Sequence, residues 1–163
     1  MKLIVFRNGQ PAFDYEWIDS EQMVLAVPRG NPLAEKADEA KGPGLPLLDP
    51  AWLAGEKIVL NSQETLMRDM VDDLYRQAGL KPDVLFETSS SKTIISVVEN
   101  GIAVGFVPQF YVVPSQKVVF FTAGHRYEWM LTVAHRRDYY LSNAEREFIR
   151  TFKELYQSTH QNR

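Results

Sequence analysis

Short apolar runs separated by turn-forming residues are the main feature of this chain. Such runs, bounded by Gly, Pro or Asn, are typical of buried strands. They predict strands at residues 3–6, 23–27, 57–60, 84–86, 104–107, 118–121 and 129–134. A turn is predicted at residues 7–11, and a surface loop rich in Gly and Pro at residues 37–50.

Three further segments place apolar residues at helical spacing. Asn61 with Glu64 predicts a capping-box-like start for the first helix, and Ser142 with Glu145 predicts the same for the last. A short helix is predicted between them, at residues 93–100. The inward positions are Leu66, Met67, Met70, Val71 and Leu74 in the first helix, Ile94, Ile95 and Val98 in the second, and Phe148, Ile149, Phe152, Leu155 and Tyr156 in the third.

The order of these elements indicates the fold class. Between Lys57 and Phe121 it is β-α-β-α-β-β, which favours an α/β fold with a mostly parallel sheet covered by helices. We expect residues from about 49 to 122 to form one compact parallel or mixed sheet with helices on both faces. The stripe made by Leu66, Met70 and Leu74 should face that sheet.

Composition narrows the function classes. A chain of 163 residues with 45% hydrophobic content can bury a core, and its net charge of −3 disfavours non-specific binding to phosphate backbones. The absence of Cys excludes disulfides and thiolate metal sites and suits a reducing cytoplasm. No apolar run is long enough to span a membrane, and the first residues are too short for a signal peptide.

Polar residues follow two neighbouring predicted strands, where each strand leads into a helix. The first group is Asn61, Ser62, Gln63 and Thr65, and the second is Ser89, Ser90, Ser91 and Thr93. One interpretation is that one serine caps a helix and the others are solvated loop. The other is a pocket for a small polar or anionic ligand, because the amides that begin a helix and adjacent hydroxyls suit such a ligand.

Candidate catalytic and metal-binding groups are few. His125, His135 and His160 lack metal-ligand spacing, and no nucleotide-binding or nucleophile motif is present. Asp72 and Asp73 are interpreted as a solvated face, and Arg136 and Arg137, near Arg126, as a basic surface cluster. We therefore expect a binding module, not an enzyme, with no catalytic residues, metal or cofactor.

Three segments resemble the effector-binding domain of LysR-type transcriptional regulators. Residues 23–34 (MVLAVPRGNPLA) resemble the family's hinge strand and the turn after it, and residues 97–108 (VVENGIAVGFVP) its helix, Gly and small-apolar strand. Residues 131–137, 141–142 and 148–149 resemble its return strand and last helix. The order and spacing of the three segments are more specific than any one of them, and they span nearly the whole chain.

The resemblance implies a type II periplasmic-binding-protein-like fold, with two lobes joined by hinge strands near Val27–Pro28 and Ala134–His135. Residues 1–27 would be a remnant of lobe one and the first hinge strand, residues 28–128 lobe two, and residues 129–163 the return hinge strand and the C-terminal helix of lobe one. Lobe one would be incomplete, because its first strand–helix–strand part is absent, as is the DNA-binding helix-turn-helix.

The function implied is effector sensing in a cytoplasmic bacterial regulator. A small polar or anionic metabolite would bind in an interlobe cleft, with Val107 and Pro108 lining it beside the two polar loops. We expect a homodimer or higher homo-oligomer, with an orphaned face on the helix at residues 65–78, and DNA binding only through the absent helix-turn-helix. The alternatives are a stand-alone solute-binding protein, which the missing signal peptide disfavours, and a small α/β enzyme, which catalytic turnover would reveal.

Overall fold

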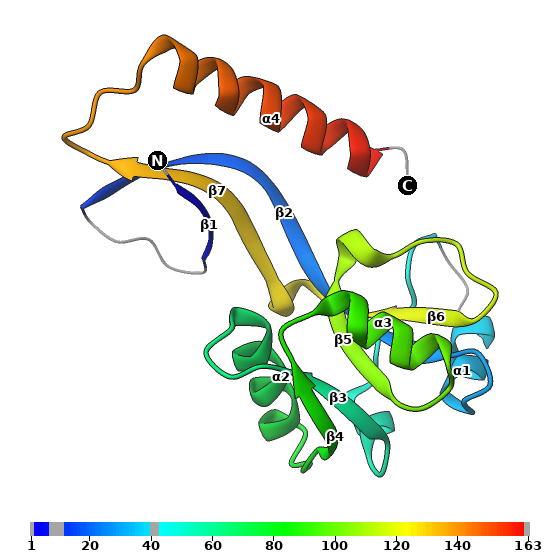
Figure 1. The fold of residues 1–163 in the computed structure, drawn as a ribbon. Helices are drawn as coiled ribbons and strands as arrows, with labels where there is room; N and C mark the ends of the chain where they lie inside the picture. The colour runs from blue at the N-terminus through cyan, green and yellow to red at the C-terminus, as the bar shows by residue number, and fades with distance from the viewer. Residues whose placement is uncertain (1, 7–11, 40–42, 162–163) are drawn as a thin grey trace. The chain divides into compact units, whose positions relative to one another are not determined.

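The computed structural model describes residues 2–6, 12–39 and 43–161 (Figure 1). Its elements, in chain order, are β1 (Lys2–Phe6), β2 (Phe13–Pro28), α1 (Leu33–Glu39), η1 (Pro50–Leu53), β3 (Lys57–Asn61), α2 (Leu66–Gln77), β4 (Asp83–Thr88), α3 (Ser91–Glu99), β5 (Val104–Pro108), η2 (Gln109–Tyr111), β6 (Val118–Thr122), η3 (His125–Tyr127), β7 (Glu128–Arg136) and α4 (Asn143–Gln161). They divide into unit 1 (Met1–Glu21 and Glu128–Arg163) and unit 2 (Gln22–Tyr127). The lobe boundaries and hinge positions expected from the sequence stay predictions.

Unit 2 contains the mixed sheet that the sequence predicts. β3 pairs in parallel with β4 on one side and with β5 on the other, and Asn61 lies opposite Thr88 in the β3–β4 register. The second half of β2 pairs antiparallel with both β5 and β6. β4 therefore ends the order β2-β5-β3-β4 as an edge strand, whereas β3 and β5 lie inside the sheet.

The helices of unit 2 cover both faces of this sheet, as predicted. From β3 the chain crosses through α2 to β4 on one side, and from β4 it crosses back through α3 to β5 on the other side of β3. Crossovers between parallel strands are right-handed, so these two crossovers in opposite directions place α2 and α3 on opposite faces. Met70 and Leu74 are fully buried on α2 and Leu66 is partly buried, which confirms the predicted stripe. On the other face, Ile94 and Val98 of α3 pack in a core cluster with strand residues.

The packing of α3 on the sheet depends on a missing side chain. A Cβ atom added to Gly105 of β5 would lie 2.3 Å from Cγ2 of Ile94, far inside van der Waals contact. Glycine at this position lets the helix approach the strand closely. The small-apolar strand noticed in the sequence is therefore a packing requirement of α3.

Unit 1 combines both ends of the chain. β1 pairs antiparallel with β7, and β7 pairs with β2. Figure 1 shows α4, coloured orange to red, beside the β2–β7 ribbon. The core cluster of unit 1 consists of Ile18, Leu131, Val133, Leu141 and Ile149, with Phe152 and Tyr156 packed against it. The predicted capping box is confirmed, because Ser142 N–H donates to Glu145 Oε2 (2.9 Å) and Glu145 N–H donates to Ser142 Oγ (3.3 Å).

Several sequence-based boundaries were wrong. β2 begins at Phe13, ten residues before the predicted strand. The sequence contained a signal for this earlier start, because Phe13, Tyr15 and Trp17 alternate with acidic residues in the period-two pattern of a strand. Helix α1 begins before the predicted 37–50 loop and takes up its residues 37–39. At the start of this helix, Asn31 Oδ1 accepts the N–H of Leu33 (2.8 Å). The turn predicted at residues 7–11, and residues 40–42 of that loop, lie outside the described residues.

Two helix starts also differ from their predictions. Helix α2 is capped by Thr65 and not by Asn61, because Glu64 adopts a positive φ of 65° and turns the chain after β3. Helix α3 begins at Ser91 with Ser90 as its cap, slightly earlier than the predicted 93–100. Within the described residues, no helix combines the length and apolar content needed to cross a membrane.

Candidate functional site

Three parallel strands of unit 2 end at one edge of the sheet, and the predicted polar loops lie there. We call this the C-terminal edge: residues 61–65 after β3, residues 88–91 after β4, and residues 107–108 at the end of β5. The N–H of Ser62 donates to the carbonyl of Thr88 over 3.0 Å, so the first two loops are directly bonded. The tertiary structure therefore brings together the two groups that the sequence singled out separately.

The loop after β3 has a buried base and an exposed rim. Asn61 is buried, and its Oδ1 has no hydrogen-bond partner among the described residues. Ser62 is half-buried and Gln63 is exposed. Thr65 serves the backbone, since its Oγ1 accepts the N–H of Arg68 (3.2 Å) and donates to the carbonyl of Ser62 (2.9 Å).

The loop after β4 divides its serines between two roles. Ser90 caps α3, because its Oγ accepts the N–H of Thr93 (3.2 Å), and its own N–H donates to Thr88 Oγ1 (3.2 Å). Exposed Ser89 and half-buried Ser91 take no part in the side-chain bonds that hold this loop of the described chain. Helix capping therefore accounts for only one of the three serines.

The residues predicted at the end of β5 differ in accessibility. Val107 is fully buried and belongs to the core cluster beneath α3, so its side chain supports the edge from inside. Pro108 is half-buried and precedes η2. Of the two, Pro108 is the one whose side chain reaches the surface.

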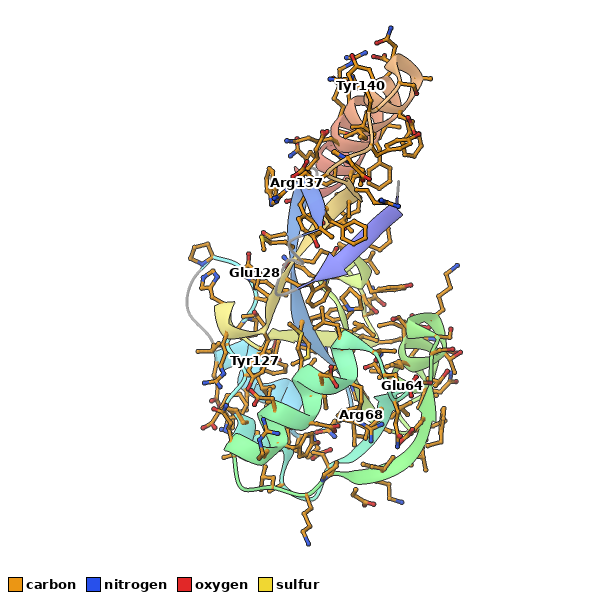
Figure 2. The ribbon with its side chains drawn as sticks, turned by 90° about the vertical axis from the view of Figure 1, so that its left-hand side faces the viewer. Glu64, Arg68, Tyr127, Glu128, Arg137 and Tyr140 are labelled. Carbon is orange, nitrogen blue, oxygen red and sulfur yellow. The ribbon has the colours of Figure 1, made fainter. Side chains whose placement is uncertain are left out.

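Arg68, labelled with Glu64 in Figure 2, orders the start of α2. Its guanidinium donates to both carboxylate oxygens of Asp72 and, over 2.8 Å, to Glu87 of β4. A further bond reaches the carbonyl of Asn61 (3.1 Å). The hydrogen bond to Glu87 is the main cause that raises the pKa of Arg68, against the opposing effect of burial. Because two carboxylates neutralise Arg68, this residue positions the loop and offers little free charge to a ligand.

The two helix starts differ in charge. Helix α2 carries Asp69 in its first turn, whereas α3 has no acidic residue there and instead carries exposed Lys92. The N-terminal end of a helix has a partial positive charge that attracts anions. The start of α3 is therefore the more electropositive side of the C-terminal edge. Lys92 was not singled out from the sequence, although its place among the serines was visible.

Other charged groups have structural roles that local sequence did not show. Asp73 was predicted to be solvated, but it accepts hydrogen bonds from Arg76 and, over 3.4 Å each, from Arg126 and Tyr127. It thereby links α2 to η3. The basic cluster expected from sequence proximity is likewise divided, because Arg126 pairs within unit 2 and Arg137, labelled in Figure 2, pairs with Asp14 of unit 1 (3.2 Å).

His125 and His135 have ordinary polar neighbours. Nδ1 of His125 lies 3.3 Å from Nε2 of Gln22, and Nδ1 of His135 lies 3.1 Å from the carbonyl of Arg136. Among residues 2–6, 12–39 and 43–161, no cluster of three or more His, Cys, Asp or Glu side chains could hold a metal ion.

A mixed sheet with polar strand-to-helix loops at its C-terminal edge is characteristic of α/β ligand-binding domains. The family model described as the LysR substrate binding domain matches residues 3–157, and the chain therefore belongs to this family. A curated relative, the "Uncharacterized HTH-type transcriptional regulator YybE" of Bacillus subtilis (strain 168), is 23% identical over 120 residues. This match covers 72% of the chain but only 38% of the relative.

Solved structures share the fold at low sequence identity. The C-terminal domain of a probable LysR family transcriptional regulator from Rhodococcus sp. RHA1 is 18% identical, with a TM-score of 0.71 over 91% of this chain and 71% of that one. The CcmR regulatory domain of Synechocystis PCC6803, in complex with 2-PG, is 15% identical (TM-score 0.71; 94% and 71% covered). The effector-binding domain of QuiR, in complex with shikimate, is 14% identical (TM-score 0.71; 97% and 71% covered). These matches confirm the periplasmic-binding-protein-like α/β fold.

Proposed function

We propose that this chain is the effector-sensing domain of a cytoplasmic bacterial LysR-type regulator and that it binds a small polar or anionic metabolite at the C-terminal edge. The observation that carries the proposal is the juxtaposition of the two polar loops, with Asn61 opposite Thr88 in adjacent parallel strands. Such edges are where open α/β sheets bind small ligands. Binding in a cleft between two lobes stays a prediction.

The chemistry of the edge favours a hydroxylated or carboxylate ligand. Ser89 and Ser91 offer hydroxyl groups outside the capping bonds, and Lys92 and the start of α3 contribute positive charge. The buried amide of Asn61 can present its Oδ1 or, after a half-turn, its Nδ2 to a partner that the described chain does not supply. Shikimate, the ligand of QuiR, is a hydroxylated carboxylate, so shikimate and 2-PG are suitable first probes.

Binding is tested by calorimetry with shikimate, 2-PG and a panel of small carboxylates. In Ser89→Ala, Ser91→Ala and Lys92→Gln we expect affinity for the bound probe to fall by about tenfold or more, because bonds to charged ligands contribute about 1.5–3 kcal/mol. The matched controls are Thr65→Ala and Ser90→Ala, which remove helix caps and should lower the free energy of unfolding by about 1 kcal/mol. Unchanged affinity in the first three variants would place the effector elsewhere.

Regulation of transcription would require the rest of the protein. The match covers only 38% of the length of the HTH-type relative, so DNA binding is proposed through a helix-turn-helix domain outside this match. Effector binding would shift the population of domain conformations and so change the geometry of the DNA-bound oligomer. A reporter assay in a full-length regulator carrying Ser89→Ala tests this, with loss of induction at unchanged protein level as the expected result.

Self-association is proposed through strand β4. Val84, Leu85 and Phe86 are 40%, 42% and 38% exposed, although they belong to an apolar strand at the edge of the sheet. The expected orphaned face on α2 is not apolar, because its large hydrophobic side chains are buried or half-buried. An exposed apolar edge strand promotes pairing with another chain, and we propose a second copy as the partner.

The self-association proposal is tested by light scattering across a range of concentrations. Leu85→Lys should weaken the oligomer, because it places a charge on the edge that a second copy would cover. Val113→Lys, a change at a similarly exposed residue outside β4, is the control and should leave assembly unchanged. A wild-type chain that stays monomeric at high concentration would contradict the proposal.

The domain is proposed to have no catalytic activity. The match to a regulatory family and the involvement of Asp73, Arg68 and Glu87 in structural bonds support this. Ligands found by calorimetry should be recovered chemically unchanged after prolonged incubation with the chain, as judged by NMR. Conversion of a bound ligand would overturn this part of the proposal.

A further inference from the structure

A second pocket lies at the edge of the unit 2 sheet opposite the C-terminal edge. It has a volume of about 460 Å³ and is formed by three turns: residues 28–32 after β2, residues 55–57 before β3 and residues 101–103 before β5. β2 runs antiparallel to β5, and β3 runs parallel to it, so these turns meet at one edge. The volume is within the range typical of small-molecule sites.

The acidic group of this pocket is Glu56. Its Oε2 accepts a hydrogen bond from Asn31 Nδ2 over 2.8 Å, which joins two of the three turns. Asn31 is itself held in place, since its Oδ1 accepts the N–H of Leu33 and its N–H donates to the carbonyl of Pro28. The hydrogen bond to Oε2 thus fixes the orientation of the carboxylate. The other oxygen, Oε1, accepts no hydrogen bond from the described residues.

The α3 side of the pocket also carries negative charge. The last turn of α3, next to the 101–103 turn, has no basic residue and ends in Glu99, so nothing there offsets the negative end of the helix dipole. Tyr75, buried and without a hydroxyl partner among the described residues, has its pKa raised to about 12 by burial and then by the Glu56 carboxylate. No ion pair of the described residues joins Glu56 to Lys57, which also lines the pocket.

We propose that this pocket binds a small ligand through a primary ammonium group, which would donate to Oε1 of Glu56. The apolar wall formed by Ile102, Ala103 and Pro32 would accept a short aliphatic chain. Both plain amines and free amino acids carry such a group. In an amino acid the carboxylate would lie toward Lys57. The site is separate from the C-terminal edge and does not depend on the function proposed for that edge.

The test uses 3-methylbutylamine and L-leucine, which share the aliphatic chain and the ammonium group. Their affinities for the full chain are measured by NMR titration up to about 10 mM, the range of weak millimolar binding. Glu56→Gln keeps an acceptor for Asn31 but removes the charge, and we expect it to weaken amine binding at least about tenfold. Glu35→Gln removes the same type of charge from exposed Glu35 of α1, outside the pocket, and should have no effect.

A second variant fills the pocket without changing its charge. A Cβ atom added at Gly30 meets no atom within 4 Å, and its φ is not in the left-handed region, so Gly30→Phe should fold and block entry. If Lys57→Gln weakens binding of L-leucine but not of 3-methylbutylamine, the ligand is of the amino-acid class. If only 3-methylbutylamine binds, the ligand is a plain amine. Failure of both probes to bind, or equal affinities in Glu56→Gln and Glu35→Gln, would overturn the proposal.

Discussion

The two units of this chain differ in how helices cover their strands. In unit 2, sheet strands β3 and β5 have helices on both faces, and side chains such as Ile58, Leu74 and Phe106 are at most 1% exposed. In unit 1 a single helix covers a ribbon of strands, and Phe148 and Leu155 of that helix are 54% and 63% exposed. The difference shows that helices on both faces bury the inner strands of unit 2, whereas the edge strand β4 and the ribbon of unit 1, covered by one helix, leave apolar surface open.

The largest expected effect is in the core of unit 2. Leu74→Ala removes a side chain that is 1% exposed and should lower the free energy of unfolding by about 2–5 kcal/mol. Urea unfolding followed by the fluorescence of Trp52, in a chain with Trp17→Phe and Trp129→Phe, measures it. Asp69→Ala, on the exposed side of the same helix, is the control. A loss below 1 kcal/mol in Leu74→Ala would mean that α2 does not anchor the sheet.

The matching change in unit 1 should have a smaller and more local effect. Ile149→Ala removes a side chain of α4 that is 4% exposed, but the site lies beside exposed residues and can relax, so we expect about 2 kcal/mol. Hydrogen exchange should rise over α4 and β7 while the amides of β3 and β5 keep their protection. Equal loss of protection in both units would show that the two units unfold together, which would contradict a local effect confined to unit 1.

Half-buried Tyr156 and buried Tyr75 provide a comparison at the level of hydrogen bonds. In unit 1 the hydroxyl of Tyr156 donates to buried Glu21 over 2.9 Å, so Tyr156→Phe should cost about 1–3 kcal/mol. In unit 2 the hydroxyl of Tyr75 has no partner in the described chain, so Tyr75→Phe should be nearly neutral or stabilising. Thermal unfolding at pH 7 measures both. A cost above 1 kcal/mol for Tyr75→Phe would indicate a bound water or ligand at that hydroxyl.

Tyr75 also predicts a dependence of stability on alkaline pH. Burial, and then the Glu56 carboxylate, raises the pKa of Tyr75 to about 12, so the native state favours the protonated hydroxyl. The contribution of this raised pKa to the free energy of unfolding is fully present below pH about 10, the ordinary tyrosine pKa, and declines as the pH rises toward 12. Tyr75→Phe should reduce this decline, as measured by urea unfolding at pH 8, 10 and 11. An identical decline in the variant would contradict the assignment.

The smallest effect is expected at the exposed surface of unit 1. Phe148→Ser should change the stability of the isolated chain by less than about 0.5 kcal/mol, because the ring is largely in solvent. Phe152→Ser, one turn further along and packed on the core cluster, is the destabilising comparison. A large loss in Phe148→Ser would show that its ring is covered in solution, by a second copy or by other residues.

Part of this fold could be predicted because local signals and tertiary packing agree. The apolar runs at residues 57–60 and 104–107 are buried on both faces, so burial, strand propensity and sequence pattern all indicate the same structure. The boundaries of β2 and α2 were harder. Whether residues 13–22 form a strand depends on pairing with β7, far away in the sequence, and the start of α2 depends on the positive φ of Glu64.

The sequence by itself determined the order of strands and helices from β3 to β6, the serines and amides at the ends of β3 and β4, and the resemblance to the LysR family. These follow from periodicity and from local turn and capping chemistry, which act within a few residues. Only the tertiary structure decided which serine caps α3, that Arg68 is neutralised by Asp72 and Glu87, and that Glu56 and Asn31 meet at the opposite edge of the sheet. The contacts of Arg68 with Glu87 and of Asn31 with Glu56 join residues 19 and 25 positions apart, so they depend on how strands pair and turns meet. The choice of cap at the start of α3 depends on the local backbone conformation, which the sequence pattern did not resolve.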